Sequence, residues 1–224
     1  DRSPSRGLGD VYKRQLYTHG VRRDCIRIDT PSAGQRVLHR VGDGLWQVEM
    51  GRFTAAPDAV GAVGLGGGPL LDVPLCAGGR AWRVHCVAVG NPHCVLFTHE
   101  PPPAGAELAA WGRALGHHPA FPGGINVEFA QPISPTGLAV TVWERGSGAT
   151  LACGTGACAV AAAAVLTGRC PRGAPILVQL PGGTLEVCVQ RDDTVLLTGD
   201  AAATFSGTVL IQPCKAPRGV VSVS

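Results

Sequence analysis

A cysteine at the expected start of a helix is the side chain of this sequence best suited to chemistry. Cys153 is followed by a Gly-Thr-Gly triplet and by an alanine-rich run ending near Leu166, which predicts a helix over 155–167. The first N–H groups of a helix have no carbonyl partner within the helix, and the helix dipole favours negative charge there. We therefore expect a lowered pKa for the Cys153 thiol, so that its thiolate can act as a base or nucleophile beside a bound carboxylate or phosphate.

Three polar segments interrupt the apolar sequence and could meet at this cysteine. Glu144 and Arg145 precede it across a glycine-rich turn. Asn91 and His93 flank a proline between two strand-like runs, and Asn126 opens another such run. Binding groups are often carried by loops at the ends of strands on a rigid scaffold. We expect the three segments to lie together around the cysteine.

Each of these residues also has a purely structural interpretation, which the residue types alone leave open. Cys153 could be a small apolar residue of the core. His93 could be a buried, hydrogen-bonded histidine, and Asn91 could start a turn at the following proline. Asn126 could mark the beginning of a strand, and Arg145 could form an ion pair on the surface.

The composition is that of a folded globular protein and not of a disordered chain. The residues are 45% hydrophobic and 16% charged. The length of 224 residues is enough for one large or two small domains. The net charge of +3 comes without a basic stripe, which argues against nucleic acid as a partner. Apolar runs fall short of the about 18 residues that a membrane-spanning helix requires, and no signal peptide is visible.

The nine cysteines argue against a disulfide scaffold or a zinc knuckle. An odd number suits a disulfide scaffold poorly, and no two cysteines have the Cys-x-x-Cys spacing. Cys86, Cys94 and Cys188 lie in apolar strand-like runs, where cysteine acts as a small buried residue, and Cys158 falls inside the expected helix. Reduced thiols of a cytoplasmic protein without a metal site are the favoured interpretation.

Short alternating segments predict a fold dominated by β-strands. Turns of Gly-Asp-Gly and Pro-Gly-Gly predict two hairpins, a loop is expected over 54–73, and a short surface helix over 106–117. The strands are expected at 25–30, 36–41, 45–50, 83–97 with a break at 90–92, 125–129, 139–143, 176–180, 184–189 and 195–197. Together with the alanine-rich helix they indicate an α+β fold, in which a mostly antiparallel curved sheet forms a barrel-like roll around that central helix.

Four short motifs give the sequence a resemblance to a known family. They are Gly-Asn-Pro-His at 90–93, Asn-Val-Glu-Phe at 126–129, Glu-Arg-Gly at 144–146 and Ala-Cys-Gly-Thr-Gly-Ala-Cys-Ala at 152–159. Each motif alone is weak, but in this order and spacing they are specific, and the chain resembles diaminopimelate epimerases over about residues 16–212. The resemblance implies a cofactor-independent, cytoplasmic, homodimeric enzyme that interconverts LL- and meso-diaminopimelate for lysine and peptidoglycan synthesis.

The resemblance also implies a role for each residue of the three segments. Cys153 would be one of two catalytic cysteines that face opposite sides of the α-carbon, one removing a proton as thiolate and the other returning one as thiol. His93 and Glu144 would tune the protonation of this cysteine pair. The implied contacts of this small-molecule substrate are Asn91, Asn126, Glu144, Arg145 and the backbone N–H groups of Gly154 and Thr155.

The second cysteine is not at the place that the resemblance predicts. Family members carry it in a Cys-Gly-Asn-Gly segment of an N-terminal domain, ahead of the stretch that starts at Leu16, and no such segment occurs here. We therefore interpret the chain as the C-terminal part of the enzyme, inactive alone. The expected parts are a non-native or disordered leader at 1–15, a remnant of the N-terminal domain at 16–23, the C-terminal domain at 24–203, a strand at 204–212 that returns to the absent domain, and a tail at 213–224.

Two other classes of function compete with this interpretation. One is an isomerase of the proline-racemase or phenazine-biosynthesis kind, against which the Glu-Arg-Gly and Gly-Asn-Pro-His motifs argue. The other is a non-catalytic fragment that serves binding or dimerisation, because one thiol can exchange a proton with only one face of a substrate.

Overall fold

The computed structural model describes residues 20, 23–30, 34–42 and 44–200 of the chain. The expected leader at 1–15, the strand at 204–212 and the tail at 213–224 lie outside the described residues.

Strands dominate the described part of the chain. They form a twelve-stranded sheet in the order β1-β2-β3-β12-β11-β10-β8-β7-β6-β5-β4, with β9 paired to β8. The strands are β1 Cys25–Thr30, β2 Gly34–Arg40, β3 Leu45–Arg52, β4 Val73–Ala77, β5 Arg80–Ala88, β6 Pro92–Phe97, β7 Asn126–Ser134, β8 Gly137–Glu144, β9 Gly148–Thr150, β10 Pro175–Leu180, β11 Gly183–Val189 and β12 Thr194–Asp200. The helices are α2 Pro57–Val60, α3 Gly105–Gly116 and α4 Gly154–Leu166.

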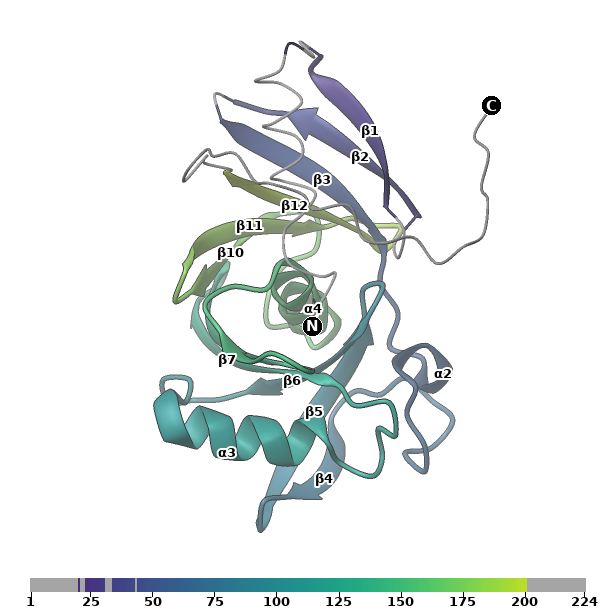
Figure 1. Ribbon diagram of the computed structural model, residues 1–224, viewed down its shortest axis with the longest axis vertical. Helices are drawn as coiled ribbons and strands as arrows, with labels where there is room; N and C mark the ends of the chain where they lie inside the picture. The colour runs from purple at the N-terminus through teal and green to yellow at the C-terminus, as the bar shows by residue number, and fades with distance from the viewer. Residues whose placement is uncertain (1–19, 21–22, 31–33, 43, 201–224) are drawn as a thin grey trace, which may run out of the picture.

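Helix α4 lies at the centre of the molecule, with β6, β7, β10 and β11 around it (Figure 1). Its residues from Gly156 to Ala164 are all buried, as is typical of a helix that is apolar on every side. The sheet curls until Thr54 pairs with Ala88, where the two residues exchange backbone hydrogen bonds of 3.1 and 2.8 Å. The predicted α+β roll around a central alanine-rich helix is therefore confirmed.

The pairing of three strands brings the predicted polar segments to one edge of the sheet. Strands β6 and β7 are parallel, with His93 opposite Asn126, so both strands begin at the same edge. Strand β8 is antiparallel to β7, with Trp143 opposite Val127, so β8 ends where β7 begins. The mostly antiparallel sheet thus contains a parallel pair at the place where the site forms.

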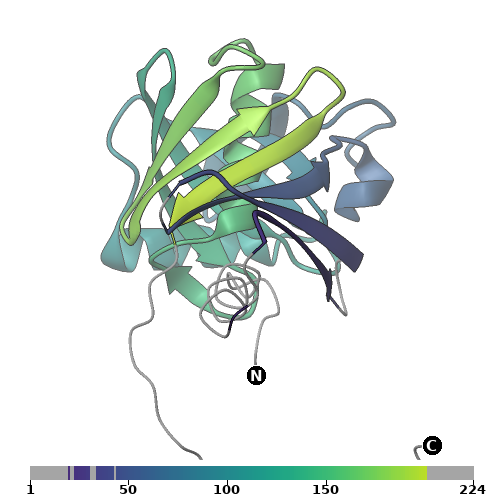
Figure 2. The same ribbon diagram turned by 90° about the horizontal axis from the view of Figure 1, so that it is seen from above.

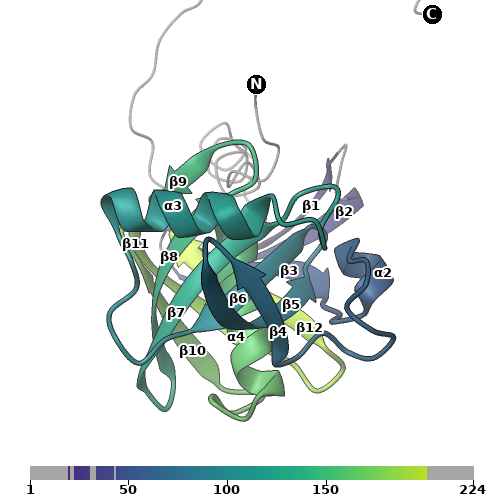
Figure 3. The ribbon, with the colours of Figure 1, turned by 90° about the horizontal axis from the view of Figure 1, so that it is seen from below.

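Helix α3 lies across the outer face of these strands (Figure 3). It covers a second apolar core that includes Phe129 from β7, Trp82 from β5 and Leu115 from α3 itself. Alternate residues of β7 therefore serve different cores, because Ala130 belongs instead to the core around α4. Seen from above, β12 runs beside β3, and β1 and β2 extend the sheet outward from there (Figure 2).

The expected loop over 54–73 contains one short helix, α2. Pro57 occupies its first turn, where the missing N–H costs nothing, and Gly61 ends it with a φ of 72°. The other helices of the described chain have 12 and 13 residues, too short to cross a lipid bilayer.

We expect Gly112→Ala to destabilise the fold because α3 packs directly on the sheet at this glycine. A Cβ atom at Gly112 would overlap the ring of Trp143 on β8. Overpacking of this kind costs about 1–3 kcal/mol, more than the up to about 1 kcal/mol that alanine adds to a helix. The free energy of unfolding, measured by urea denaturation, should fall, whereas Gly67→Ala should leave it unchanged because a Cβ there meets nothing within 4 Å. Equal denaturation midpoints for the two variants would contradict this packing.

Candidate active site

Cys153 is the N-cap residue of α4, as its position in the sequence predicts. Its backbone is extended, with φ −141° and ψ 112°, and helical geometry begins at Gly154. The Sγ atom accepts a hydrogen bond from the N–H of Gly156 at 3.3 Å and lies 3.5 Å from the hydroxyl of Thr155. Its side chain is therefore held by the first turn of the helix.

The expectation of a lowered thiol pKa is wrong for this structure. Burial of Cys153 raises its pKa to about 12, and the carboxylates of Glu128 and Glu144 add to the rise. The hydrogen bonds from Thr155 and Gly156 act in the opposite direction but do not outweigh these causes. In this arrangement Cys153 is a thiol, which suits a proton donor better than a nucleophile.

This pKa predicts slow alkylation of Cys153. With a pKa of about 12 instead of the ordinary 9.0, the thiolate fraction at pH 8 falls about 10³-fold. The rate of iodoacetamide labelling at Cys153, followed by peptide mass spectrometry, should still rise tenfold per pH unit between pH 9 and 10. A cysteine in an unstructured reference peptide should level off there. A Cys153 rate that levels off near pH 9 would contradict the raised pKa.

His93 is completely buried and is bonded through both ring nitrogens. Its Nδ1 atom lies 2.7 Å from Oε1 of Glu128 on β7, and its Nε2 atom lies 2.9 Å from Oδ1 of Asn91. Asn91 and His93 thus belong to one hydrogen-bonded group. The simple turn-forming alternative for Asn91 does not account for this contact, because its side chain binds the histidine.

Glu128 is the site residue that the sequence interpretation missed. The sequence carries one signal for it: Asn126 and Glu128 are two positions apart on β7, and such residues face the same side of a sheet. The sequence analysis predicts Asn126, at the start of this strand, as a substrate contact. The same periodicity would have placed the carboxyl group of Glu128 on the face that meets α4.

Asn126 and Arg145 form a second hydrogen-bonded group at the same edge. The Asn126 Oδ1 atom accepts the backbone N–H of Arg145 at 2.8 Å, and Asn126 itself is buried. The Arg145 guanidinium is exposed and donates through Nη1 to the carbonyl oxygens of Gly123 at 2.8 Å and Gly124 at 3.4 Å. The surface ion pair considered for Arg145 is not present among the residues that the structure describes.

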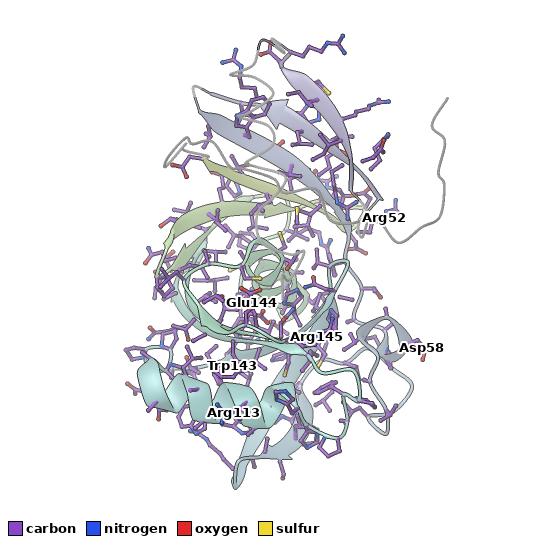
Figure 4. The ribbon with its side chains drawn as sticks, viewed as in Figure 1. Arg52, Asp58, Arg113, Trp143, Glu144 and Arg145 are labelled. Atoms are coloured by element: carbon purple, nitrogen blue, oxygen red, sulfur yellow. The ribbon has the colours of Figure 1, made fainter. Side chains whose placement is uncertain are left out.

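Glu144 lies at the end of β8 on the side of the central helix. Figure 4 shows Trp143 on the side of α3 and its neighbour Glu144 on the side of α4. Glu144 is 2% exposed, and its charge raises the pKa of both Cys153 and Glu128. Its predicted position beside the cysteine agrees with this electrostatic effect.

Gly154 and Thr155 form the start of α4 directly after the cysteine. The N–H groups of these first helical residues have no carbonyl partner within the helix, so they can bind an anion. Cys158, by contrast, is fully buried among the alanines of α4, as the sequence predicts for a structural cysteine. The structure thus gathers all the predicted site residues at one edge of the sheet and at the helix that starts there.

The sequence matches the family model described as diaminopimelate epimerase over residues 85–204. Similar proteins include the diaminopimelate epimerases of Nostoc punctiforme, 43% identical over 83% of this chain and 65% of that protein, and Thermosynechococcus vestitus, 45% identical over 82% of this chain and 65% of that protein. The chain therefore spans 65% of the length of these curated relatives.

Solved structures with the same fold have much lower sequence identity. A probable proline racemase from Agrobacterium radiobacter K84 matches 92% of this chain and 68% of its own with a TM-score of 0.65 at 16% identity. A phenazine biosynthesis protein from Bacillus anthracis matches 92% of this chain and 76% of its own with a TM-score of 0.58 at 14% identity. At these identities the likeness extends to the fold alone.

Proposed function

Since this chain belongs to the diaminopimelate epimerase family, we propose that it provides one half of a two-cysteine site that interconverts LL- and meso-diaminopimelate. The observation that carries the proposal is the meeting of three polar segments around Cys153, the N-cap residue of α4. The proline-racemase and phenazine-biosynthesis alternatives are supported by fold likeness only.

Cys153 is proposed to exchange a proton with one face of the substrate's α-carbon. In one direction a second cysteine, as thiolate, removes the α-proton, and the electron pair of the broken C–H bond spreads into the α-carboxylate. Cys153 then donates its thiol proton to the opposite face, which leaves the carbon inverted and Cys153 as thiolate. The raised pKa of Cys153 suits this donor role. In the reverse direction the two sulfur atoms exchange roles.

The start of α4 is suited to hold the charge that this reaction creates. The N–H groups of Gly154 and Thr155 are proposed to bind the α-carboxylate, where negative charge increases as the α-proton leaves. Arg145 is proposed to bind a substrate carboxylate through guanidinium N–H groups, a charge-assisted contact. Asn91, Asn126 and Glu144 are proposed to contact the polar groups of the substrate.

The proposal can be tested in a chimera that supplies the second cysteine. The N-terminal part of the Nostoc punctiforme relative, where the family resemblance predicts the Cys-Gly-Asn-Gly segment, would be joined ahead of Leu16 of this chain. We call the product the two-cysteine chimera. In D2O this chimera should convert LL- into meso-diaminopimelate and place deuterium at the inverted α-carbon, as followed by chiral chromatography and NMR. The chain alone should not invert the substrate.

Three outcomes would count against the proposal. A folded two-cysteine chimera that leaves diaminopimelate unchanged would contradict the substrate. Inversion of proline by the same chimera would instead favour the racemase alternative. Rapid epimerisation by the chain alone would contradict the assignment of a second cysteine outside it.

The cellular setting of the enzyme is proposed from the resemblance. A cofactor-independent, cytoplasmic homodimer that serves lysine and peptidoglycan synthesis is consistent with family membership. The dimer can be tested by analytical ultracentrifugation of the two-cysteine chimera, where a sedimentation coefficient of the monomer at micromolar concentration would contradict it.

A further inference from the structure

Glu128 carries a carboxyl group in the interior of the protein, between the central helix and the strands of the site. It is completely buried on β7, opposite Val95 of β6 and Val142 of β8. Its Oε1 atom would lie 2.8 Å from a Cβ atom at Gly156, so the carboxyl group touches the first turn of α4. A glycine at this position leaves the space that the carboxyl group occupies.

This buried carboxyl group has one hydrogen-bond partner among the described residues. Its Oε1 atom lies 2.7 Å from Nδ1 of His93, whereas its Oε2 atom has no partner in the part of the chain that the structure describes. A buried acceptor without a partner destabilises the folded state, since it loses its bonds to water. Burial accordingly raises the pKa of Glu128. Such an arrangement is unfavourable for stability alone and points to a role in the site.

The contacts of His93 determine where its protons lie. The Asn91 Oδ1 atom on Nε2 is an acceptor, so in this assignment Nε2 carries a proton and donates it. The Nδ1 atom and Glu128 Oε1 then share one further proton at 2.7 Å, either as imidazolium with carboxylate or as imidazole with carboxylic acid. The pair is neutral in both forms, and it becomes negative only when this shared proton is lost.

Glu128 therefore interacts with two predicted site residues, His93 and Cys153. Through His93 it is connected to the strand β6, and its charge also acts on the Cys153 thiol, whose pKa it raises. Among the described residues, Glu144 on β8 and Cys94 on β6 are further titratable groups that interact with it. A carboxyl group in this position can influence the protonation of the thiol without any contact with the substrate.

We infer that Glu128 is a positioning residue of this site, which holds a shared proton on Nδ1 of His93, fixes the proton on Nε2, and keeps Cys153 protonated between turnovers. The inference rests on the proposed epimerase function and deepens it, because it adds a buried His93–Glu128 pair to the cysteine. Neither residue of the pair needs to touch the substrate for this effect.

The inference is tested first on the chain itself, without any assay of epimerisation. Glu128→Gln keeps the size of the side chain but removes the charge. We expect iodoacetamide to label Cys153 about tenfold faster in this variant at pH 9, which corresponds to a thiol pKa lower by about one unit. The matched control is Glu107→Gln, which removes an exposed carboxylate on α3 and should leave the rate unchanged. An unchanged labelling rate in Glu128→Gln would overturn the inference.

NMR of the nitrogen-15-labelled chain gives a second measurement that does not depend on a variant at Glu128. Both ring nitrogens of His93 should be hydrogen-bonded, with a strongly deshielded ring proton that exchanges slowly with water. The signal is assigned by its loss in His93→Gln. Ring nitrogens of His93 with the chemical shifts and fast proton exchange of a free imidazole would overturn the inference. This result holds even if the Glu128→Gln variant does not fold.

Activity of the two-cysteine chimera separates this inference from the proposed function. In an active chimera, Glu128→Gln should lower kcat about 10- to 100-fold with a small change of KM and should shift the pH profile of kcat. Glu107→Gln should change neither. An unchanged pH profile of kcat in Glu128→Gln would overturn the inference. If the chimera without any substitution is inactive, the proposed function is overturned instead. The labelling and NMR results then decide on the role of Glu128.

Discussion

Cys153→Ser in the two-cysteine chimera is expected to lower kcat for epimerisation about 10³-fold or more. A general acid or base contributes about 10²- to 10⁴-fold to an enzymatic rate, and a serine hydroxyl replaces neither the thiol nor the thiolate. Serine is similar in size to cysteine and can still accept the hydrogen bond from the N–H of Gly156, so the start of α4 should persist. The rate is measured as conversion of LL- into meso-diaminopimelate.

Deuterium exchange at the α-carbon, measured separately for the two isomers, tests which face of the substrate Cys153 serves. In Cys153→Ser the second cysteine can still remove the α-proton from the isomer that presents it on that face, so this isomer should exchange deuterium without inverting. The other isomer should not exchange. Cys158→Ser is the matched control, since Cys158 is buried within α4 and should leave kcat nearly unchanged. Equal exchange of both isomers in Cys153→Ser would contradict the assignment of Cys153 to one face.

The elements of the fold follow from local sequence, but their arrangement around the site does not. The alanine-rich run predicts α4 to within a residue, and the Gly-Asp-Gly and Pro-Gly-Gly turns predict the hairpins β2–β3 and β10–β11. The parallel pairing of β6 with β7 has no such local signal, because α3 and its flanking loops separate the two strands. This pairing is what aligns His93 with Asn126.

The local sequence predicts the wrong direction for the pKa shift of Cys153. A helix N-terminus lowers the pKa of a cysteine, but burial in apolar surroundings raises it. Here the roll buries Cys153, and β7 and β8 bring Glu128 and Glu144 close to it. Glu144 precedes Cys153 by a turn and one short strand, whereas Glu128 comes from a strand farther back in the sequence. The distance of both carboxylates from the thiol is a consequence of the tertiary fold. The motifs predict which residues lie around Cys153, with the exception of Glu128, whereas the direction of this pKa shift required the structure.

Arg145→Ala is expected to weaken substrate binding strongly, with an increase in KM and a loss of about 100-fold in kcat/KM. Hydrogen bonds to a charged group contribute about 1.5–3 kcal/mol, and about 2.7 kcal/mol corresponds to 100-fold. Among the described contacts only Nη1 of Arg145 is occupied, by the carbonyl oxygens of Gly123 and Gly124. The other guanidinium N–H groups are available to a carboxylate. Steady-state kinetics of the two-cysteine chimera give the result.

Two further variants separate carboxylate binding from general effects of charge and folding. Arg113→Ala removes an exposed arginine on α3 that lies on the opposite side of β8, over the ring of Trp143, and should leave KM unchanged (Figure 4). Arg145→Lys keeps the positive charge but loses the two-pronged geometry of the guanidinium, so it should recover only part of the affinity. A similar increase in KM for Arg113→Ala would mean that net charge, and not a contact of Arg145, attracts the substrate. Full recovery by lysine would contradict a bidentate contact, because a single ammonium group cannot bind both carboxylate oxygens with the same geometry.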